Sequence, residues 1–267
     1  SFLNLTLHHL TRIAIVAAMA QELNGLKEHL INPICTPYAG RDFWSGQINN
    51  KEVVLVLAKI GKVAAATTTT LLIQHFKASQ IVFTGVAGGI GTKVKVGDLI
   101  IATELLQHDM NASPLFPIYE IPLYGRSHFP THTRLSLELQ NACEEVVQEI
   151  QNPQATSLII QALKQGLLEL GLPQPQLFNG LILSGDQFIS SQQASTDLQK
   201  NIPFALAVEM EGAAGAQVCH DFNIPLAVLR VISDKADDQA HLDFNRFIEK
   251  VACFYSQAVV FNLLSRL

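Results

Sequence analysis

Three acidic side chains follow closely on apolar runs in widely separated parts of the sequence. Glu22, Glu211 and Asp234 each come within a few residues of the end of such a run. If the runs are parallel strands, all three acids lie beyond carboxyl ends of strands, which is where open α/β sheets bind ligands. Carboxyl groups can donate and accept protons there. We therefore expect the three acids to converge on one edge of a sheet and to form an acid–base site.

Each of these acids also has an ordinary structural explanation. Asp234 is suited to capping a helix or a turn, and Glu22 and Glu211 to the first turn of a helix, where an acid complements the dipole. The glycine run GVAGGI (85–90) does not match the dinucleotide fingerprint, and a tight turn explains it equally well. Several uncompensated acids at buried strand ends would nevertheless be costly without a polar ligand or water, and this favours a working site.

The elements that must position these acids alternate along the chain, and this alternation predicts a mostly parallel sheet covered on both faces. We predict an α/β fold: a single three-layer domain over residues 1–267, with a mostly parallel central mixed sheet flanked by helices. Residues 1–11 are expected to be a flexible segment, and 108–132, rich in proline and aromatic residues, an irregular excursion. The expected strands are 13–19, 52–60, 80–84 running into a glycine loop, 98–107, 177–186, 204–210 and 225–234, and the expected helices are 20–30, 61–76, 136–150, 157–171, 211–222 and 241–266.

Composition narrows the classes of function. Charged residues make up 15% of the chain, against roughly 25% in an ordinary soluble domain, which favours a subunit with a buried oligomer interface. A net charge of −5 gives no basic surface for nucleic acid. The longest apolar stretches are too short to span a membrane. The four cysteines are scattered, so we expect buried thiols, no metal and a cytoplasmic location; the first residue is not methionine, and a removed leader stays an open alternative.

Five stretches of the sequence together resemble one known family. They are similar to stretches of the 5′-methylthioadenosine/S-adenosylhomocysteine nucleosidases. The stretches are IAIVAAMAQEL (13–23), TGVAGGI (84–90), SGDQFI (184–189), AVEMEGAAGAQVCHDFNIP (207–225) and LRVISDKAD (229–237) followed by HLDF. These enzymes belong to the nucleoside phosphorylase superfamily. The resemblance implies a nucleoside phosphorylase-like fold, usually a homodimer, without a cofactor. It also implies hydrolysis of the N-glycosidic bond of a small-molecule nucleoside to adenine and a 5-thio-substituted ribose.

The resemblance also assigns roles. Asp234 is expected to protonate adenine N7 and must hold a proton near neutral pH, whereas Glu22 is expected to stay ionised and activate the attacking water. Leaving-group protonation and fixed carboxylates near the sugar offset the charges that develop as the bond breaks. Glu211 is expected to bind the ribose hydroxyls. The other substrate-binding residues are expected to be Met19, Ile60 and Phe244 around the 5′ group, Met210 beneath the sugar, Phe188 and Ile189 at adenine, and Val86, Glu209, Arg230 and Ser233 in the surrounding network.

Some features depart from the family or remain open. Val86 stands where some relatives have a hydroxyl residue, which removes one hydrogen bond near the water and ribose. Pro122 is a candidate to reach a neighbouring subunit's pocket, Phe116, Tyr119 and Tyr124 are candidates for core, pocket or interface positions, and His108 is expected to be a structural hydrogen-bonder.

Three other functions compete with the nucleosidase. They are a phosphorolytic enzyme on the same fold, a nucleosidase acting on aminodeoxyfutalosine or 5′-deoxyadenosine, and a non-catalytic nucleoside-binding domain. The stretch AAMAQE (17–22) places an acid where a phosphate would be repelled, which favours hydrolysis. The joint presence of three acids argues against a binder, because binding needs no protonating group.

Overall fold

The computed structural model describes residues 11–267, apart from the side chains of 241–243. Most of the predicted flexible segment 1–11 lies outside the described residues. Apolar runs rich in β-branched residues form the strands of the sheet, and most are buried on both faces. The strands are β1 (Arg12–Ala17), β2 (Ile31–Tyr38), β3 (Arg41–Ile48), β4 (Lys51–Leu57), β5 (Gln80–Phe83), β6 (Val86–Gly89), β7 (Leu99–Gln107), β8 (His128–Pro130), β9 (Leu177–Ser184), β10 (Ala205–Glu209) and β11 (Leu226–Asp234).

In the helices, apolar residues recur every three or four positions, so that one face of each helix can be buried. In α3, for example, Leu135, Leu139, Ala142 and Val146 are buried, three or four residues apart, as one helical face requires. The helices are α1 (Ala20–Lys27), α2 (Lys62–Gln74), α3 (Thr133–Gln151), α4 (Leu158–Glu169), α5 (Gln192–Asn201), α6 (Gly212–Phe222), α7 (Ala240–Phe247), the π-helical turn η1 (Ile248–Ala252) and α8 (Cys253–Arg266).

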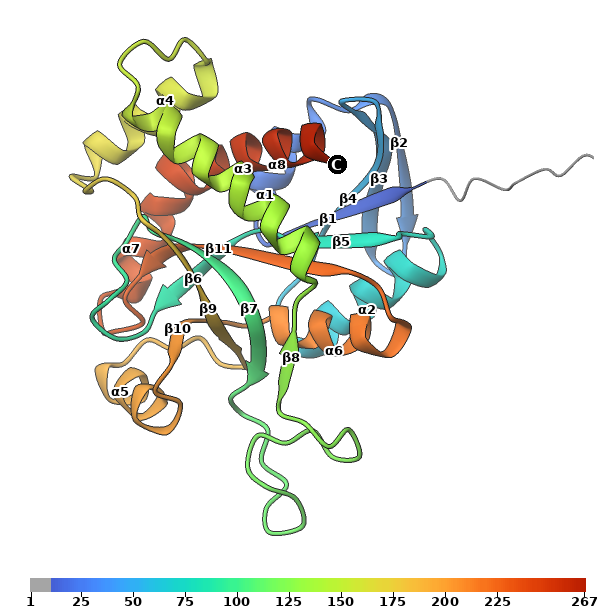
Figure 1. Cartoon of the computed structure of the whole chain (residues 1–267), viewed down its shortest axis with the longest axis vertical. Helices are drawn as coiled ribbons and strands as arrows, with labels where there is room; N and C mark the ends of the chain where they lie inside the picture. Colours follow the sequence, from blue (N-terminus) through green and yellow to red (C-terminus); the bar gives the residue numbers. More distant parts are fainter. Residues whose placement is uncertain (1–10) are drawn as a thin grey trace, which may run out of the picture.

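The strands form one mixed sheet in the order β2-β3-β4-β1-β5-β11-β6-β10-β9-β7-β8 (Figure 1). Strands β4, β1, β5, β11 and β6 run parallel to one another, and β7, β9 and β10 are parallel among themselves but opposite to the first group. An extra antiparallel pairing of β11 with β7 closes β11, β6, β10, β9 and β7 into a ring. Strand β11 therefore belongs both to the open parallel part and to the ring.

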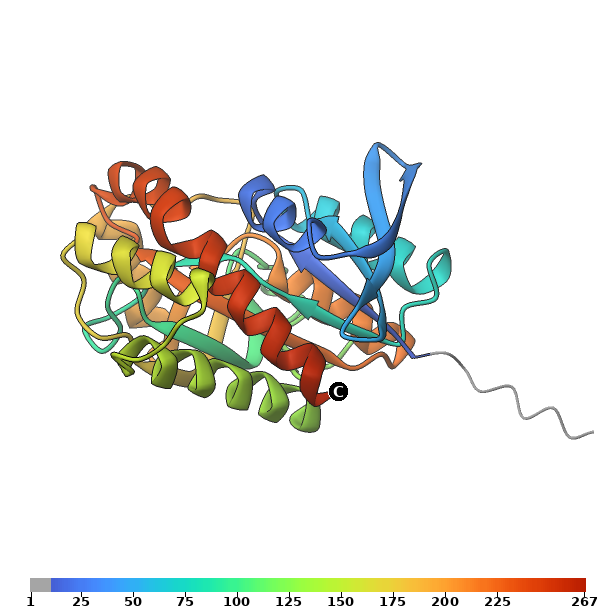
Figure 2. The ribbon, with the colours of Figure 1, turned by 90° about the horizontal axis from the view of Figure 1, so that it is seen from above.

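Helices cover both faces of the sheet, as a predominantly buried sheet requires (Figure 2). One apolar cluster joins the sheet to α1, α3, α4 and α8, and a second joins its other face to α2 and α6. The predicted α/β architecture with a central sheet between helical layers is confirmed.

Four parts of the chain differ from the sequence-based expectation. The glycine run is not a loop: its residues 86–89 form β6, whose small residues fit between β11 and β10. Residues 31–48 form the β2–β3 hairpin, which was not predicted because β2 contains two prolines and is mostly exposed, as an edge strand can be. Helix α5 and the π-helical turn within the predicted helix 241–266 were also not predicted.

The predicted excursion is largely irregular and projects from the ring as the connection between β7 and β8 (Figure 1). A separate feature lies near the C-terminus. Residues Phe244–Arg266 form a helix that is long and apolar enough, by length and composition, to cross a membrane. The apolar stretches considered in the sequence did not include it. Because 67% of its most apolar window is buried inside the protein, its apolar face is explained by packing on the sheet.

Candidate active site

Glu22 is fully buried at the start of α1, just beyond β1. Its Oε1 accepts a hydrogen bond from the backbone N–H of Met19 at 3.2 Å, and its Oε2 accepts one from the hydroxyl of Ser256 on α8. Burial raises the pKa of this carboxyl to about 7, while the Ser256 hydroxyl, the Arg230 charge and the Met19 amide lower it. Glu22 can therefore exchange a proton near neutral pH, as a general base must.

Arg230 and Glu209 form a buried ion pair that joins β11 to β10. The guanidinium also donates through Nη1 to the carbonyl of Thr84 at 2.9 Å. Glu209 accepts further hydrogen bonds from the Ser184 hydroxyl and from backbone N–H groups at the start of α6. A helix N-terminus favours an anion, so Glu209 both neutralises Arg230 and fixes the start of α6. This geometry agrees with a supporting position for Glu209.

Glu211 lies directly before α6 and is almost fully buried. Its Oε2 accepts a hydrogen bond at 3.2 Å from the backbone N–H of Gly61, which has a φ of 97° that favours glycine. Burial and the neighbouring negative charge of Glu209 raise the pKa of Glu211 to about 7, against the influence of Arg230. Two carboxyl groups with strongly raised pKa values thus lie within the electrostatic reach of one guanidinium.

Asp234 ends β11 and is 2% exposed. Its Oδ2 accepts a hydrogen bond from the Ser233 hydroxyl at 2.7 Å and its Oδ1 accepts one from the backbone N–H of Ala236 at 2.8 Å. A Cβ atom at Gly88 would lie 3.0 Å from Asp234 Oδ1, so a glycine here lets the carboxyl lie against β6. Because Gly88 pairs with both Asp234 and Val208, Asp234 is separated by one strand from the end of β10 that carries Glu209. Strand register thus places Asp234 near the end of β10, while Glu22 and Glu211 both lie within the electrostatic reach of Arg230 on β11.

Apolar residues surround this polar centre. Phe188 and Phe244 contact each other edge to face, with ring centroids 6.1 Å apart. Val86 is buried in a large apolar cluster, and Met19 and Phe244 pack against that cluster; we call Val86, Met19 and Phe244 the apolar wall. Such a wall is suited to an apolar substituent of a ligand.

The remaining predicted residues differ in how exposed they are. Ile189 is buried in a cluster with Ala236, beside the Asp234 carboxyl, and Met210 is partly buried. Ile60 is 74% exposed, so the structure places it at the rim, next to Gly61, and not in the apolar wall.

A polar clamp at the rim was not predicted. It consists of Lys62, Asp109 and Asp186: the Lys62 ammonium pairs with Asp109 at 2.7 Å, and Asp186 accepts from the Lys62 backbone N–H at 2.7 Å. The Asp186 N–H in turn donates to Asp109 at 2.8 Å. The clamp joins the start of α2 to the segments after β7 and β9. The signal for it was present, because Asp109 and Asp186 both follow strand ends, where polar residues gather.

Two other polar positions depart from expectation. Ser256, which contacts Glu22, gave no signal in the sequence, because it stands inside an apolar helix that reads as core. His108 was expected to be a structural hydrogen-bonder, but its buried Nε2 has no hydrogen-bond partner within the described part of the chain. The close approach of Gly185 to the imidazole leaves the ring held by packing.

No group of three or more His, Cys, Asp or Glu side chains in the described residues is arranged to hold a metal ion.

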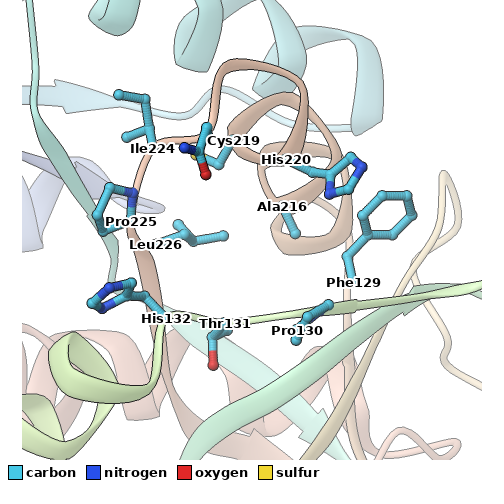
Figure 3. A pocket seen from close by; sticks show the side chains of 11 residues that line it. Phe129, Pro130, Thr131, His132, Ala216, Cys219, His220, Ile224, Pro225 and Leu226 are labelled. Atoms are coloured by element: carbon cyan, nitrogen blue, oxygen red, sulfur yellow. The ribbon is translucent and has the colours of Figure 1, made fainter.

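An open cavity of roughly 390 Å³ lies elsewhere, at the other end of β11 (Figure 3). It is lined by side chains of β8, of α6 with Cys219 and His220, of the beginning of β11 with Leu226, and by His132, the N-cap of α3. None of the residues predicted for the site borders this cavity.

Comparisons with known proteins show the family to which the chain belongs. The family model of the phosphorylase superfamily matches residues 12–264. A 5′-methylthioadenosine/S-adenosylhomocysteine nucleosidase of Shewanella frigidimarina is 36% identical over 259 residues, which cover 96% of this chain and 100% of that protein.

The chain is also similar, in fold and in sequence, to solved structures of nucleoside hydrolases. The nucleosidase of the same name from Neisseria meningitidis, in complex with methylthio-immucillin-A, has a TM-score of 0.82 and 30% identity, covering 97% of this chain and 100% of that one. A futalosine hydrolase of Helicobacter pylori strain 26695 has a TM-score of 0.79 and 32% identity, again covering 97% of this chain and 100% of that one.

Proposed function

Because the chain belongs to the phosphorylase superfamily, we propose that it is a nucleosidase that hydrolyses 5′-methylthioadenosine and S-adenosylhomocysteine. The products are adenine and the 5-thio-substituted ribose. The observation that carries this proposal is the burial of Glu22 and Glu211 within the electrostatic reach of Arg230 on β11, the strand that the buried Asp234 ends. The extent of the similarity to the Shewanella and Neisseria nucleosidases supports the same substrates.

The site geometry accommodates a stepwise transfer of protons. Asp234 donates a proton to N7 of adenine, the bond between C1′ and N9 breaks, and its electron pair leaves with the base. Positive charge then develops on the ribose, where the anionic groups of the site favour it. Water attacks C1′ and gives a proton to Glu22, whose pKa of about 7 allows it to accept one.

Hydrolysis fits the site better than phosphorolysis. The buried guanidinium of Arg230 is already neutralised by Glu209, and the anionic form of Glu22 lies within its electrostatic reach. A phosphate dianion brought to this place would meet carboxylates, which repel it. We therefore expect adenine release to be independent of phosphate.

The similarity to the Helicobacter futalosine hydrolase supports a second candidate function, the hydrolysis of an aminodeoxyfutalosine. Both functions use the same acid–base groups and differ in what the 5′ pocket accepts. The experiment is a measurement of adenine release, with and without phosphate, from 5′-methylthioadenosine, S-adenosylhomocysteine, 5′-deoxyadenosine and aminodeoxyfutalosine. Release from the first two at the highest kcat/KM supports the proposal. Preference for the last substrate selects the second function, and phosphate-dependent release refutes hydrolysis.

The homodimer and the cytoplasmic location expected from the sequence remain part of this proposal. Exposed apolar side chains support the dimer: Leu115 is 86%, Leu123 is 93% and Val63 is 79% exposed in the single chain. Exposed apolar side chains are typical of an interface where they form a contiguous patch. Sedimentation velocity over a range of concentrations tests it, and a monomer at every concentration would refute it.

A further inference from the structure

We propose that Ser256 is a positioning residue of the reaction, which holds the Glu22 carboxylate in its ionised, water-activating orientation. This inference rests on the proposed function and extends it to a residue of the last helix. Ser256 touches Glu22 and not the reacting atoms, so it acts through the carboxyl group.

The contact depends on a close approach of two helices. Gly25 of α1 faces Gln257 of α8, and a Cβ atom at Gly25 would overlap the side-chain amide of Gln257. A larger residue in place of Gly25 would therefore require the Gln257 side chain to move. At this short separation the preceding residue, Ser256, is 2% exposed and its hydroxyl reaches Glu22 Oε2.

Two donors fix the two oxygens of Glu22. Oε1 is held by the backbone N–H of Met19 and Oε2 by Ser256, so the plane of the carboxylate is determined. Each carboxylate oxygen retains a further lone pair, and this can accept a hydrogen bond from water. Held in this way, Glu22 can bind and deprotonate a water without first having to reorient.

Of the two hydrogen-bond donors to Glu22, only Ser256 can be removed by a side-chain substitution. The charged and titratable groups that act on Glu22 are Arg230 on β11 and Cys253 on α8, and Arg230 is already paired with Glu209. The Met19 donor is a backbone group that no substitution by an ordinary side chain removes. Among the described residues, the side-chain hydroxyl that donates to Glu22 is that of Ser256.

The direction of the effect follows from the charge of the acceptor. A hydroxyl that donates to a carboxylate stabilises the ionised form and lowers its pKa. Hydrogen bonds to charged groups contribute enough to shift a pKa by about one unit. Loss of the hydroxyl must therefore raise the pH at which Glu22 becomes a base.

The test compares the pH dependence of kcat/KM for adenine release in Ser256→Ala, Ser256→Thr and Ser265→Ala with that of the wild type. Ser265→Ala is the matched control, because it removes a serine hydroxyl from the same helix at an exposed position. We expect Ser256→Ala to move the acidic limb up by about one pH unit, which corresponds to about fivefold lower kcat/KM at pH 7 and a ratio that approaches one at higher pH. Ser256→Thr retains the hydroxyl and should restore the limb, and Ser265→Ala should not move it. An equal loss at every pH would mean that Ser256 is only structural and would overturn the proposal.

A second measurement does not need activity. Urea midpoints of wild type and Ser256→Ala are compared at pH 5 and pH 9, and the same pair is measured in a Glu22→Gln background. The destabilisation by Ser256→Ala should be larger at pH 9, where Glu22 is ionised. This difference should vanish in the Glu22→Gln background, because the side chain at that position then carries no charge at either pH. A destabilisation equal at both pH values refutes the role of Ser256. If instead the wild type releases no adenine from any nucleoside, the proposed function fails while this comparison still reports on the contact.

Discussion

The two ends of β11 offer opposite settings for polar side chains. At the end occupied by Asp234, carboxyl groups are buried and the pKa values of Glu22 and Glu211 are raised to about 7. At the end occupied by Leu226, roughly 26 Å away by strand length, an open cavity is bordered by polar groups that already have structural tasks (Figure 3). His132 caps α3 by accepting a hydrogen bond from Leu135, for example.

The contrast shows that open volume and chemical capacity are separate properties. The cavity has space, but Cys219 within it is a buried thiol whose pKa burial raises to about 12, far from a reactive thiolate. The acid site holds carboxyl groups, Glu22 and Glu211, whose pKa values burial raises to about 7. Clustered perturbed groups are the better guide to function.

The largest effect is expected from a substitution at the Asp234 end of β11. Asp234→Asn removes the proton donor but keeps the shape, and turnover of 5′-methylthioadenosine should fall by about 10²–10⁴-fold. Circular dichroism and the melting temperature should show that the fold is intact. Normal turnover by a folded Asp234→Asn protein would remove the acid end of β11 from the mechanism.

Glu209→Gln should affect both stability and turnover. It leaves the Arg230 charge buried without its anion, which costs about 3–5 kcal/mol of unfolding free energy. Urea unfolding measures this loss, and Glu52→Gln, at a half-buried position on β4, is the control. Equal stability of Glu209→Gln and the control would show that the ion pair does not hold β10 to β11.

The raised pKa of Glu22 predicts a pH dependence of stability. Because its pKa is about 7 in the folded chain and 4.5 for a carboxyl in the unfolded chain, the folded state binds the proton more tightly than the unfolded state between these values. The stability that this carboxyl contributes is therefore fully present below pH 4.5 and is lost as pH rises through 7, by roughly 3 kcal/mol.

Glu22→Gln cannot titrate at this position and should lose that part of the pH dependence. Its unfolding free energy relative to wild type should therefore rise between pH 4.5 and 8, as measured by urea unfolding at each pH. Glu211→Gln should behave in the same direction, since the pKa of Glu211 is also raised. Parallel curves for wild type and Glu22→Gln would contradict a buried, titrating carboxyl.

The smallest effect is expected at the cavity. His220→Ala removes a side chain that borders it and packs edge to face on Phe129. We expect kcat/KM for adenine release to stay within about twofold of wild type, because surface substitutions away from a site rarely perturb it. A loss as large as that of Asp234→Asn would mean that both ends of β11 serve the reaction.

Local sequence patterns predicted much of the fold and the positions of the three acids at the ends of strands. Buried parallel strands read as apolar runs, so their ends, and with them Glu22, Glu211 and Asp234, could be located from the sequence. The β2–β3 hairpin could not, because Pro33 and Pro37 argue against a strand unless it is known to lie at an edge.

The partners of the acids were beyond local reasoning. Ser256 lies 234 residues from Glu22 in the sequence, and Gly61 lies 150 residues from Glu211. Such contacts depend on how α8 packs on α1 and on where α2 begins, which no single stretch of sequence encodes. The same holds for β6, whose glycines resemble a loop until β10 and β11 are placed on either side.

The late position of β11 in the chain has a consequence for biosynthesis. Strands β5, β6 and β7 all pair with β11, yet Leu226–Asp234 leaves the ribosome well after all three of these strands. Until then these three strands have unpaired edges, and such edges invite association with other chains. Nascent or prematurely terminated polypeptides lacking β11 should therefore depend on chaperones, and a stop codon just before it should yield aggregates and not a weakened enzyme.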